Sequence, residues 1–420
     1  MLDQKGMLKQ YRMKTNQTQQ EIANQLGYSH SYISKLERGI IPLNNKFLTK
    51  LYNTFDIKEL QISYHNSSTN QLFHNWFISL SHHHKRKSEQ FLQEIQEKFP
   101  ITQANNVSLL YNLYRFYHLT LEHNISEAQA LLPRIIKNSL QLTSTGLFLF
   151  YKAIAYHYIQ TDQLSSAAEA LKNAHEYMEG DDSEYYLYCA MLKTKMKAVY
   201  ESNEYLHETQ QLLRVNFDIS KTLLVRIMLS INQIQQHNYE QAKKGFHQII
   251  DTAYHKEYMI KTELIYYFLA KIHYLQNNYE EALRFLRHAK VKEKVPYFKV
   301  MYLYLTAKIY WKLNRKNDAL AYISNIQRLE VNQKYQYKAL LLKRTILHQL
   351  ETDDTKILLL DEIIPYYHRN EDFPEEYKCY QLLQDICYNM KMYKQSADYL
   401  KKMVIIREQA SNYRIYDKSK

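Results

Sequence analysis

Glycine and proline are scarce in this chain, with 6 of each among 420 residues, and only 3 cysteines are present. A β protein with many strands needs more turn-forming residues, so we predict an all-α fold. Cys189, Cys379 and Cys387 are odd in number and show no CxxC spacing, which argues against a disulfide framework and against a thiolate zinc site. This cysteine usage fits a reducing cytoplasm.

Long hydrophobic runs are also missing. The N-terminus has no apolar run of signal-peptide length, and charges such as Lys152 and Lys271 interrupt the most apolar segments before the roughly 20 residues that span a bilayer. We therefore expect a cytoplasmic protein that does not enter a membrane. The chain does have 40 tyrosines and a net charge of +12. Such a surplus favours an anionic partner without identifying it.

Sequence motifs for catalysis and cofactor binding do not occur. The six glycines are isolated, so neither a P-loop nor a dinucleotide fingerprint can form. His207-Glu208 has Gln211 where a zinc protease motif needs its second histidine, and no GxSxG motif is present. The tract HHHKRK at residues 82–87 has no carboxylate or cysteine at ligand spacing, so we expect a solvated loop there. We predict no enzyme activity, no cofactor and no metal.

Residues 5–60 contain two short helix signals separated by a tight turn. The sequence TQQE that begins at Thr18 is a capping box for a helix that runs to Leu26. Gly27 can adopt the left-handed conformation that ends this helix, and Ser29 can cap the next one, which stops at an Arg-Gly pair. Two short helices joined in this way predict a helix-turn-helix.

The stretch TQQEIANQLGYSHSYISKLERG resembles the repressor-like helix-turn-helix family of the Xre or Cro/cI type. The resemblance implies a five-helix DNA-binding domain at residues 1–64, with the third helix in the major groove. It also implies an ion pair between Arg12 and Glu37 that ties the first helix to the third. The residues that it assigns to DNA binding are Gln19, Ser29 and Arg38 on phosphates, and His30, Ser31 and Lys35 on base edges, with Tyr32 beside them.

The charge of this region agrees with DNA binding. Residues 1–65 contain 9 Lys or Arg and 5 Asp or Glu, a net charge of +4. Such a small module normally binds DNA as a dimer on two half-sites. We therefore expect a homodimer on a palindromic operator in double-stranded DNA.

Residues 65–108 are predicted to be a linker followed by a helical pair. The polar stretch 65–70 lacks periodicity and would form the linker. Two helices are expected at about 71–81 and 86–98. Trp76 lies on the apolar face that would dock this pair on its neighbours.

Residues 263–296 read as two helices joined by a short turn at Gln276–Asn278. Alanines such as Ala270 and Ala282 let the two backbones approach closely. The unit resembles a tetratricopeptide repeat of about 34 residues, which needs stacked neighbours to bury its apolar faces. Similar hairpins begin near Leu109, Phe148, Cys189, Leu223, Glu263, Val300 and Lys338, with a poorer one after Tyr377.

The spacing of these hairpins is about 34 to 41 residues. We predict a right-handed, tetratricopeptide-like α-solenoid of seven to eight hairpins at residues 109–412, and a tail at 413–420. The repeat family implies that first helices line a concave groove. Placing the repeats in register puts these residues on that groove: Lys152, Tyr156, Lys193, Lys197, Tyr200, Tyr267, Lys271, Tyr274, Tyr304, Lys308 and Trp311.

A single lysine on such a face can simply be a solvated helix former. The recurrence of lysine with aromatic residues instead favours an extended peptide, since aromatic rings can clasp the chain and lysine can pair with its carboxylates. The whole architecture resembles the RRNPP peptide-pheromone receptors, especially the PlcR-like and NprR-like regulators. This resemblance implies a homodimer that binds a short signalling peptide in its groove and thereby switches DNA binding.

Two other functions remain open at this point. The repeats could capture a folded protein partner, with the helix-turn-helix only localising the complex. The protein could also be a constitutive repressor that uses its repeats only to dimerise.

Overall fold

The computed structural model of this protein describes residues 12, 17–38, 41, 47, 50, 54, 67–81, 85–98, 106–139, 142–216, 218–255, 262–289, 296–329 and 333–412. Every regular element in these ranges is helical, which confirms the predicted fold class. The first, fourth and fifth helices predicted for the DNA-binding domain, the three histidines at 82–84 and the tail at 413–420 lie outside the described residues.

None of the helices in these ranges is long and apolar enough to cross a membrane.

The chain divides into two compact units, residues 1–154 with 173–181, and residues 155–172 with 182–420. The division falls within α10 (Ser144–Gln160) and α11 (Leu164–Glu176). The other helices of the first unit are α2 (Gln19–Leu26), α3 (His30–Glu37), α6 (Ser67–Ser81), α7 (Lys85–Lys98), α8 (Asn106–Leu121) and α9 (Ile125–Asn138).

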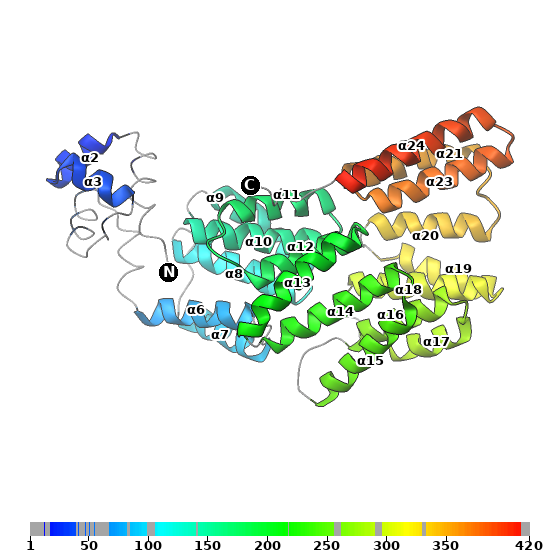
Figure 1. The fold of residues 1–420 in the computed structure, drawn as a ribbon, viewed down its shortest axis with the longest axis horizontal. Coiled ribbons are helices and arrows are strands. Elements are labelled where there is room, and N and C mark those ends of the chain that lie inside the picture. The colour runs from blue at the N-terminus through cyan, green and yellow to red at the C-terminus, as the bar shows by residue number, and fades with distance from the viewer. Residues whose placement is uncertain are drawn as a thin grey trace. The chain divides into compact units, whose positions relative to one another are not determined.

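The second unit is a succession of helical hairpins, coloured from green to red in Figure 1. Its helices are α12 (Ser183–Lys195), α13 (Val199–Asn216), α14 (Ile219–Gln235), α15 (Tyr239–His255), α16 (Thr262–Leu275), α17 (Tyr279–His288), α18 (Pro296–Lys312), α19 (Lys316–Gln327), α20 (Gln333–Ile346), α21 (Asp353–Leu358), η2 (Leu359–Ile363), α22 (Ile364–Arg369), α23 (Phe373–Asn389) and α24 (Tyr393–Asn412).

The helical pair predicted after the linker is confirmed as α6 and α7. Trp76 is fully buried, and its ring centre lies 5.9 Å from that of Tyr111 and 5.8 Å from that of Tyr114 on α8. Two details were wrong. Residues 67–70 belong to the first turn of α6 rather than to a linker, and residues 85–87 begin α7 rather than continuing a loop. Ser, Thr, Asn and Lys are tolerated in a first helical turn because its N–H groups face solvent.

The repeat prediction is confirmed by the eight hairpins from α8 with α9 to α23 with α24. The last hairpin, expected to be poor, begins at Phe373 and is regular. Ala270 and Ala282 have no exposed surface, and the same holds for Ala307 with Ala319. At Gly245 of α15 an added Cβ would lie 2.4 Å from the Ser230 hydroxyl of α14. Small residues therefore set the close approach of paired helices.

The hairpin turns use a left-handed residue that is never glycine in this part of the chain. Asn277 has φ of 62°, and the N–H of Asn278 donates to the carbonyl of His273 at 2.8 Å, a bond of the Schellman type. The equivalent turn residues are His123, Asp162, Lys197, His237, Asn314, His348 and Lys391. Each side chain in this conformation costs roughly 1–2 kcal/mol, which stacking of the hairpins must offset.

A π-helical segment, η2, interrupts the second helix of the hairpin that starts with α20. Pro365 follows it within α22 and has no N–H to donate. Its ring would also crowd the carbonyl four residues earlier, so a wider turn at this point keeps the helix continuous. Periodicity alone did not indicate this widening.

Candidate functional site

The helix-turn-helix is built by the local signals that its sequence contains. Thr18 and Glu21 form the capping box: the Thr18 N–H donates to the Glu21 carboxylate at 2.6 Å, and the Glu21 N–H donates to the Thr18 hydroxyl at 3.2 Å. Gly27 ends α2 with φ of 62°, and the Ser29 hydroxyl accepts from the Tyr32 N–H at the start of α3. These caps end α2 and begin α3, and fully buried side chains such as Leu26 and Ile33 pack the two helices together.

An ion pair ties the segment before α2 to α3, as predicted. Arg12 Nε donates to Glu37 Oε1 at 2.8 Å, and the Glu37 side chain is only 2% exposed. Gln19 Nε2 donates to Glu37 Oε2 at 2.6 Å. The hydrogen bond with Glu37 raises the pKa of Arg12 above its ordinary value. The Gln19 amide is therefore engaged within the domain, and contact with a phosphate there would compete with Glu37.

The predicted reading face of α3 is open. His30, Ser31 and Lys35 are exposed, and so is Arg38 at the C-terminal cap. Tyr32 differs, because its ring stacks on Tyr28 with ring centres 4.9 Å apart and is half-buried. The exposed groups suit contact with bases and phosphates, whereas Tyr32 contributes to the packing of the domain.

A cluster of lysine and tyrosine side chains lies on the first helices of four hairpins in the repeats. We call it the Lys–Tyr cluster. Its members are Tyr267, Lys271 and Tyr274 on α16, Tyr304 and Lys308 on α18, Tyr335 and Lys338 on α20, and Glu375 and Lys378 on α23. The register of the turns places them together. Tyr267, Tyr304 and Lys338 each lie ten residues before the left-handed residue of their own hairpin.

Rings and ammonium groups alternate through the Lys–Tyr cluster. The Nζ atom of Lys308 lies 4.8 Å from the ring centre of Tyr274 and 5.9 Å from that of Tyr304. The Nζ atom of Lys338 lies 5.6 Å from the ring centre of Tyr304 and 5.4 Å from that of Tyr335. Such cation–π contacts hold the lysines while removing part of their water.

One carboxylate, Glu375, belongs to the cluster, and a second, Asp372, borders it. Glu375 accepts from Lys378 at 2.6 Å and from Lys338 at 3.1 Å. At the start of the same helix, Lys334 pairs with Asp372 at 2.6 Å. Attraction to Lys338, Lys378 and Lys334 outweighs burial and holds the pKa of Glu375 well below its usual range.

The lysines of the cluster repel one another. Burial, followed by repulsion from Lys338, Lys378, Lys197 and Lys308, lowers the pKa of Lys271 to about 8. Burial and Lys338 lower the pKa of Lys308 to about 8 as well, although Glu375 acts in the opposite direction. With Lys271, Lys308, Lys338 and Lys378 against Glu375, the cluster holds more positive charge than its own carboxylate balances.

Some residues predicted for the groove were misplaced. Lys197 and Tyr200 do not lie on a first helix, because α12 begins at Ser183 and ends at Lys195. Lys197 is the left-handed turn residue itself, and Tyr200 lies on α13 with 74% of its surface exposed. The spacing of small residues placed the start of this repeat near Cys189, about six residues after its observed start at Ser183. This spacing does not show where the turn between the two helices lies. The charge of Lys197 still reaches Lys271.

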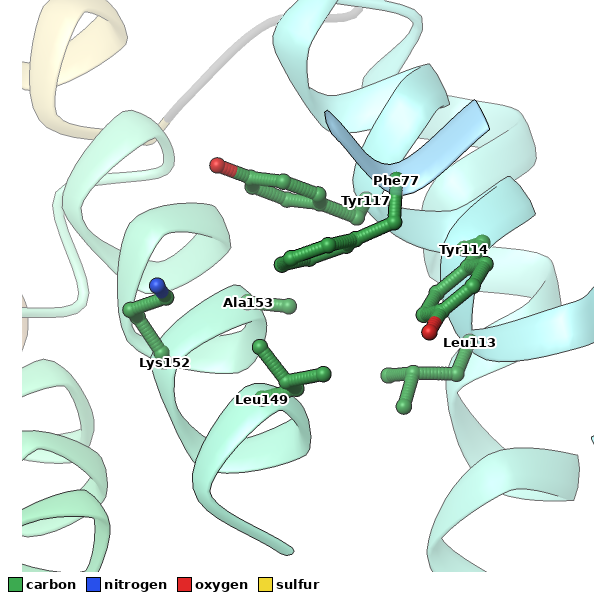
Figure 2. Close-up of a pocket in the computed structure, with 7 residues that line it drawn as sticks. All are labelled: Phe77, Leu113, Tyr114, Tyr117, Leu149, Lys152 and Ala153. Atoms are coloured by element: carbon green, nitrogen blue, oxygen red, sulfur yellow. The ribbon is translucent and has the colours of Figure 1, made fainter. Parts of the chain in front are cut away.

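Three other predicted groove residues are buried: Lys152 at 3%, Tyr156 at 7% and Lys193 at 2% exposed. Tyr156 stacks on Tyr188 with ring centres 4.6 Å apart. Figure 2 shows Lys152 beside a small cavity lined by aromatic and aliphatic side chains, including Phe77. The Lys152 ammonium group also lies over the Phe148 ring, 4.9 Å from its centre. Trp311 is half-buried beneath Lys312, 4.8 Å from ring centre to Nζ.

Sequence reasoning missed the part of the cluster on α20 and α23. Lys338, Lys378 and Glu375 are brought to Lys308 only by the stacking of hairpins. The available signal was the distance to the hairpin turn. Lys338, like Tyr267 and Tyr304, lies ten residues before the left-handed residue of its turn. Among the described residues, no group of His, Cys, Asp and Glu side chains could hold a metal ion.

Comparisons with known proteins agree with both parts. Residues 6–57 match the family described as "Helix-turn-helix domain". No curated protein sequence matches the chain. The structure of NprR in complex with its cognate peptide NprX is similar with a TM-score of 0.67 and 14% identity, over 81% of this chain and 100% of that one.

Two Rap structures are similar as well. A Rap protein complexed with competence and sporulation factor gives a TM-score of 0.66 at 15% identity, over 83% of this chain and 100% of that one. The Rap conjugation gene regulator of plasmid pLS20, in complex with the Phr* peptide, gives 0.53 at 13% identity, over 81% and 95%. At these identities the likeness shows the fold. The chain therefore combines a helix-turn-helix domain with the helical-repeat fold of the Rap and NprR structures.

Proposed function

We propose that this protein is a cytoplasmic transcriptional regulator without enzyme activity, whose repeats bind a short signalling peptide and thereby switch DNA binding. The observation that carries the proposal is that one chain contains both an exposed face on α3 and the cationic, tyrosine-rich Lys–Tyr cluster on the first helices of its repeats. The compared structure of NprR holds its cognate peptide NprX and that of the Rap conjugation gene regulator holds the Phr* peptide, which supports the same class of ligand here.

The reading face supports recognition of a DNA half-site. Lys35 and His30 can donate to acceptor atoms on guanine, and Arg38 can hold a phosphate. A homodimer would place two such faces on a palindromic operator. A peptide that contacts several repeats would favour one arrangement of the hairpins over another. This would change the distance between the two DNA-binding domains of the dimer.

Two variants test the two halves of this proposal separately. An operator is first selected from random duplex DNA with the full-length protein. Lys35→Ala should then weaken binding to this operator by roughly 10- to 100-fold, the value of one good base contact. Lys271→Ala with Lys308→Ala should leave DNA binding unchanged without peptide. Gel shifts with and without synthetic peptides, chosen for retention by the wild-type protein, give both readouts.

Lys244→Ala serves as the matched control, because Lys244 is an exposed lysine on the second helix of a repeat. Its DNA binding and its peptide response should equal those of the wild type. The proposal fails if Lys35→Ala still selects the same operator, or if the double variant responds to peptide as the wild type does. Retention of a folded partner but of no peptide would favour a protein-capture function instead.

A further inference from the structure

The Lys–Tyr cluster has a charge imbalance at one end. Glu375 is within ion-pair distance of Lys338 and Lys378. Within the described residues, neither Lys271 nor Lys308 has a carboxylate at that distance. The two unpaired lysines are instead covered by aromatic rings, Lys271 by Phe268 at 5.7 Å and Lys308 by Tyr274 and Tyr304.

This arrangement is unfavourable unless an anion joins it. A lysine that loses water to aromatic neighbours keeps its charge only at a cost in free energy, and nearby lysines increase that cost. The Nζ atom of Lys308 lies 4.8 Å from the ring centre of Tyr274, which follows Lys271 by about one turn of α16, so Lys308 approaches the face of α16 that carries Lys271. One carboxylate near both would relieve the repulsion and gain two charge-assisted hydrogen bonds.

Glu375 shows that the cluster accepts a carboxylate. It bridges Lys338 and Lys378, and its charge extends to Lys308, whose pKa it acts to raise. Lys338 and Lys308 both lie against the Tyr304 ring, with Nζ atoms 5.6 and 5.9 Å from its centre. Lys338 can therefore be shared between Glu375 and a carboxylate that enters beside Lys308.

We propose that Lys271 and Lys308 receive one carboxylate of the peptide ligand, and that Glu375 competes with this carboxylate for Lys338. The inference rests on the proposed function, since it assumes that the repeats bind a peptide. The carboxylate can come from the C-terminus of the peptide or from an Asp or Glu side chain. The chemistry is the same in both cases, and the experiment separates them.

The probe is a set of four pools of random heptapeptides with acetylated N-termini. The pools contain or omit Asp and Glu, and carry a free or an amidated C-terminus. Each pool is mixed with the full-length protein, bound peptides are separated by size exclusion, and retention is measured by mass spectrometry. We expect the pool without any carboxylate to be retained less than one-tenth as well as the best pool. Two pools have one kind of carboxylate: either Asp and Glu side chains with an amidated C-terminus, or a free C-terminus without Asp and Glu. The pool of these two that is retained more strongly identifies the source of the bound carboxylate.

Three single variants locate the subsite. Lys271→Gln and Lys308→Gln should each reduce the preference for carboxylate pools by at least 10-fold, while retention of the pool without carboxylates stays unchanged. Glu375→Gln should raise retention of the carboxylate pools several-fold, because it frees Lys338 and adds no bulk. Lys244→Gln is the control on an exposed lysine and should change nothing. Circular dichroism and thermal melting verify that each variant folds.

The outcomes separate this inference from the proposed function. If folded wild-type protein retains none of the four pools, peptide binding itself is wrong, and the subsite falls with it. If pools with and without carboxylates are retained equally, peptide binding stands and the carboxylate subsite is wrong. The subsite is also wrong if a carboxylate preference survives both lysine variants. A loss of retention in Glu375→Gln would mean that Glu375 supports the ligand and does not compete with it.

Discussion

The two cationic regions of this protein handle charge in opposite ways. On α3, Lys35 and Arg38 are exposed, and the one strongly engaged carboxylate, Glu37, is neutralised by Arg12. In the Lys–Tyr cluster, Lys271 and Lys308 are half-buried against rings and repel one another. Solvated charges suit a polyanion whose binding depends on salt. Partly desolvated charges suit a single carboxylate held at short range.

The two regions also differ in what builds them. The helix-turn-helix is built largely by signals between near neighbours, such as the Thr18 capping box and the Gly27 turn, with the Arg12–Glu37 pair as a longer contact of 25 residues. The Lys–Tyr cluster joins residues from four hairpins, from Tyr267 to Lys378. A local motif is robust to changes elsewhere, whereas a cluster assembled by stacking depends on every intervening hairpin. The predictions that follow test these differences.

The largest expected effect concerns the ion pair that neutralises the helix-turn-helix. Arg12→Ala leaves the Glu37 carboxylate, whose side chain is 2% exposed, with the Gln19 amide as its remaining hydrogen-bond donor among the residues that the structure describes. We expect a loss of about 2–3 kcal/mol in local stability, because breaking a buried pair strands a charge. Hydrogen exchange of the amides in residues 19–38 measures this loss.

Arg38→Ala is the matched control, because Arg38 is an exposed arginine of the same motif whose Nε donates to the Ser34 carbonyl at 3.4 Å. It should weaken DNA binding and leave the exchange rates close to those of the wild type. Equal exchange rates in the two variants would show that the Arg12–Glu37 pair contributes nothing to stability. The contrast between the neutralised charge of the helix-turn-helix and the repelling charges of the Lys–Tyr cluster would then be lost.

An intermediate effect tests how burial and repulsion destabilise the charge of Lys271 in the Lys–Tyr cluster. The pKa of Lys271 is about 8 in the folded chain and its ordinary value is 10.5. Between these values the unfolded chain binds more protons, so the free energy of unfolding should rise with pH from about 8 to 10. Lys271→Met removes this dependence and should stabilise the protein at pH 7, on the order of 1 kcal/mol once solvent screening is allowed for.

Urea unfolding at pH 7, 8 and 9 measures this effect through the midpoint. The advantage of Lys271→Met over the wild type should shrink as pH rises, since the wild-type lysine loses its proton. Lys244→Met, on an exposed face, should show no such trend. A constant difference across the three pH values would rule out destabilisation of the lysine charge, by burial or by repulsion, and leave only packing.

The smallest effect concerns the left-handed turns. Lys391 is exposed and has φ of 60° at the turn between α23 and α24. Lys391→Gly should stabilise the chain by roughly 0.5–1 kcal/mol, because glycine adopts this conformation without strain while losing some entropy on folding. Thermal melting measures the gain. Lys394→Gly, within α24, should instead destabilise by a similar amount, and stabilisation by both changes would disprove the conformational explanation.

Much of this protein was predictable from sequence because its signals are local. The capping box at Thr18, the Gly27 turn and the alternation of alanines with large residues specify helices and hairpins over short distances. The pair of Arg12 with Glu37 was also found, through resemblance to a known motif. Lys197 and Tyr200 were misplaced because alanine spacing does not determine where a turn lies.

The sequence by itself determined the helical hairpins and the exposed residues of α3, since caps, turns and periodicity act between near neighbours. Only the tertiary structure decided which lysines are solvated and which are desolvated. The contact of Lys338 with Tyr304, and the bridge from Lys378 to Glu375 to Lys338, arise from stacking of α18, α20 and α23. Burial and repulsion depend on all neighbours in space, so identical lysines acquire different chemistry.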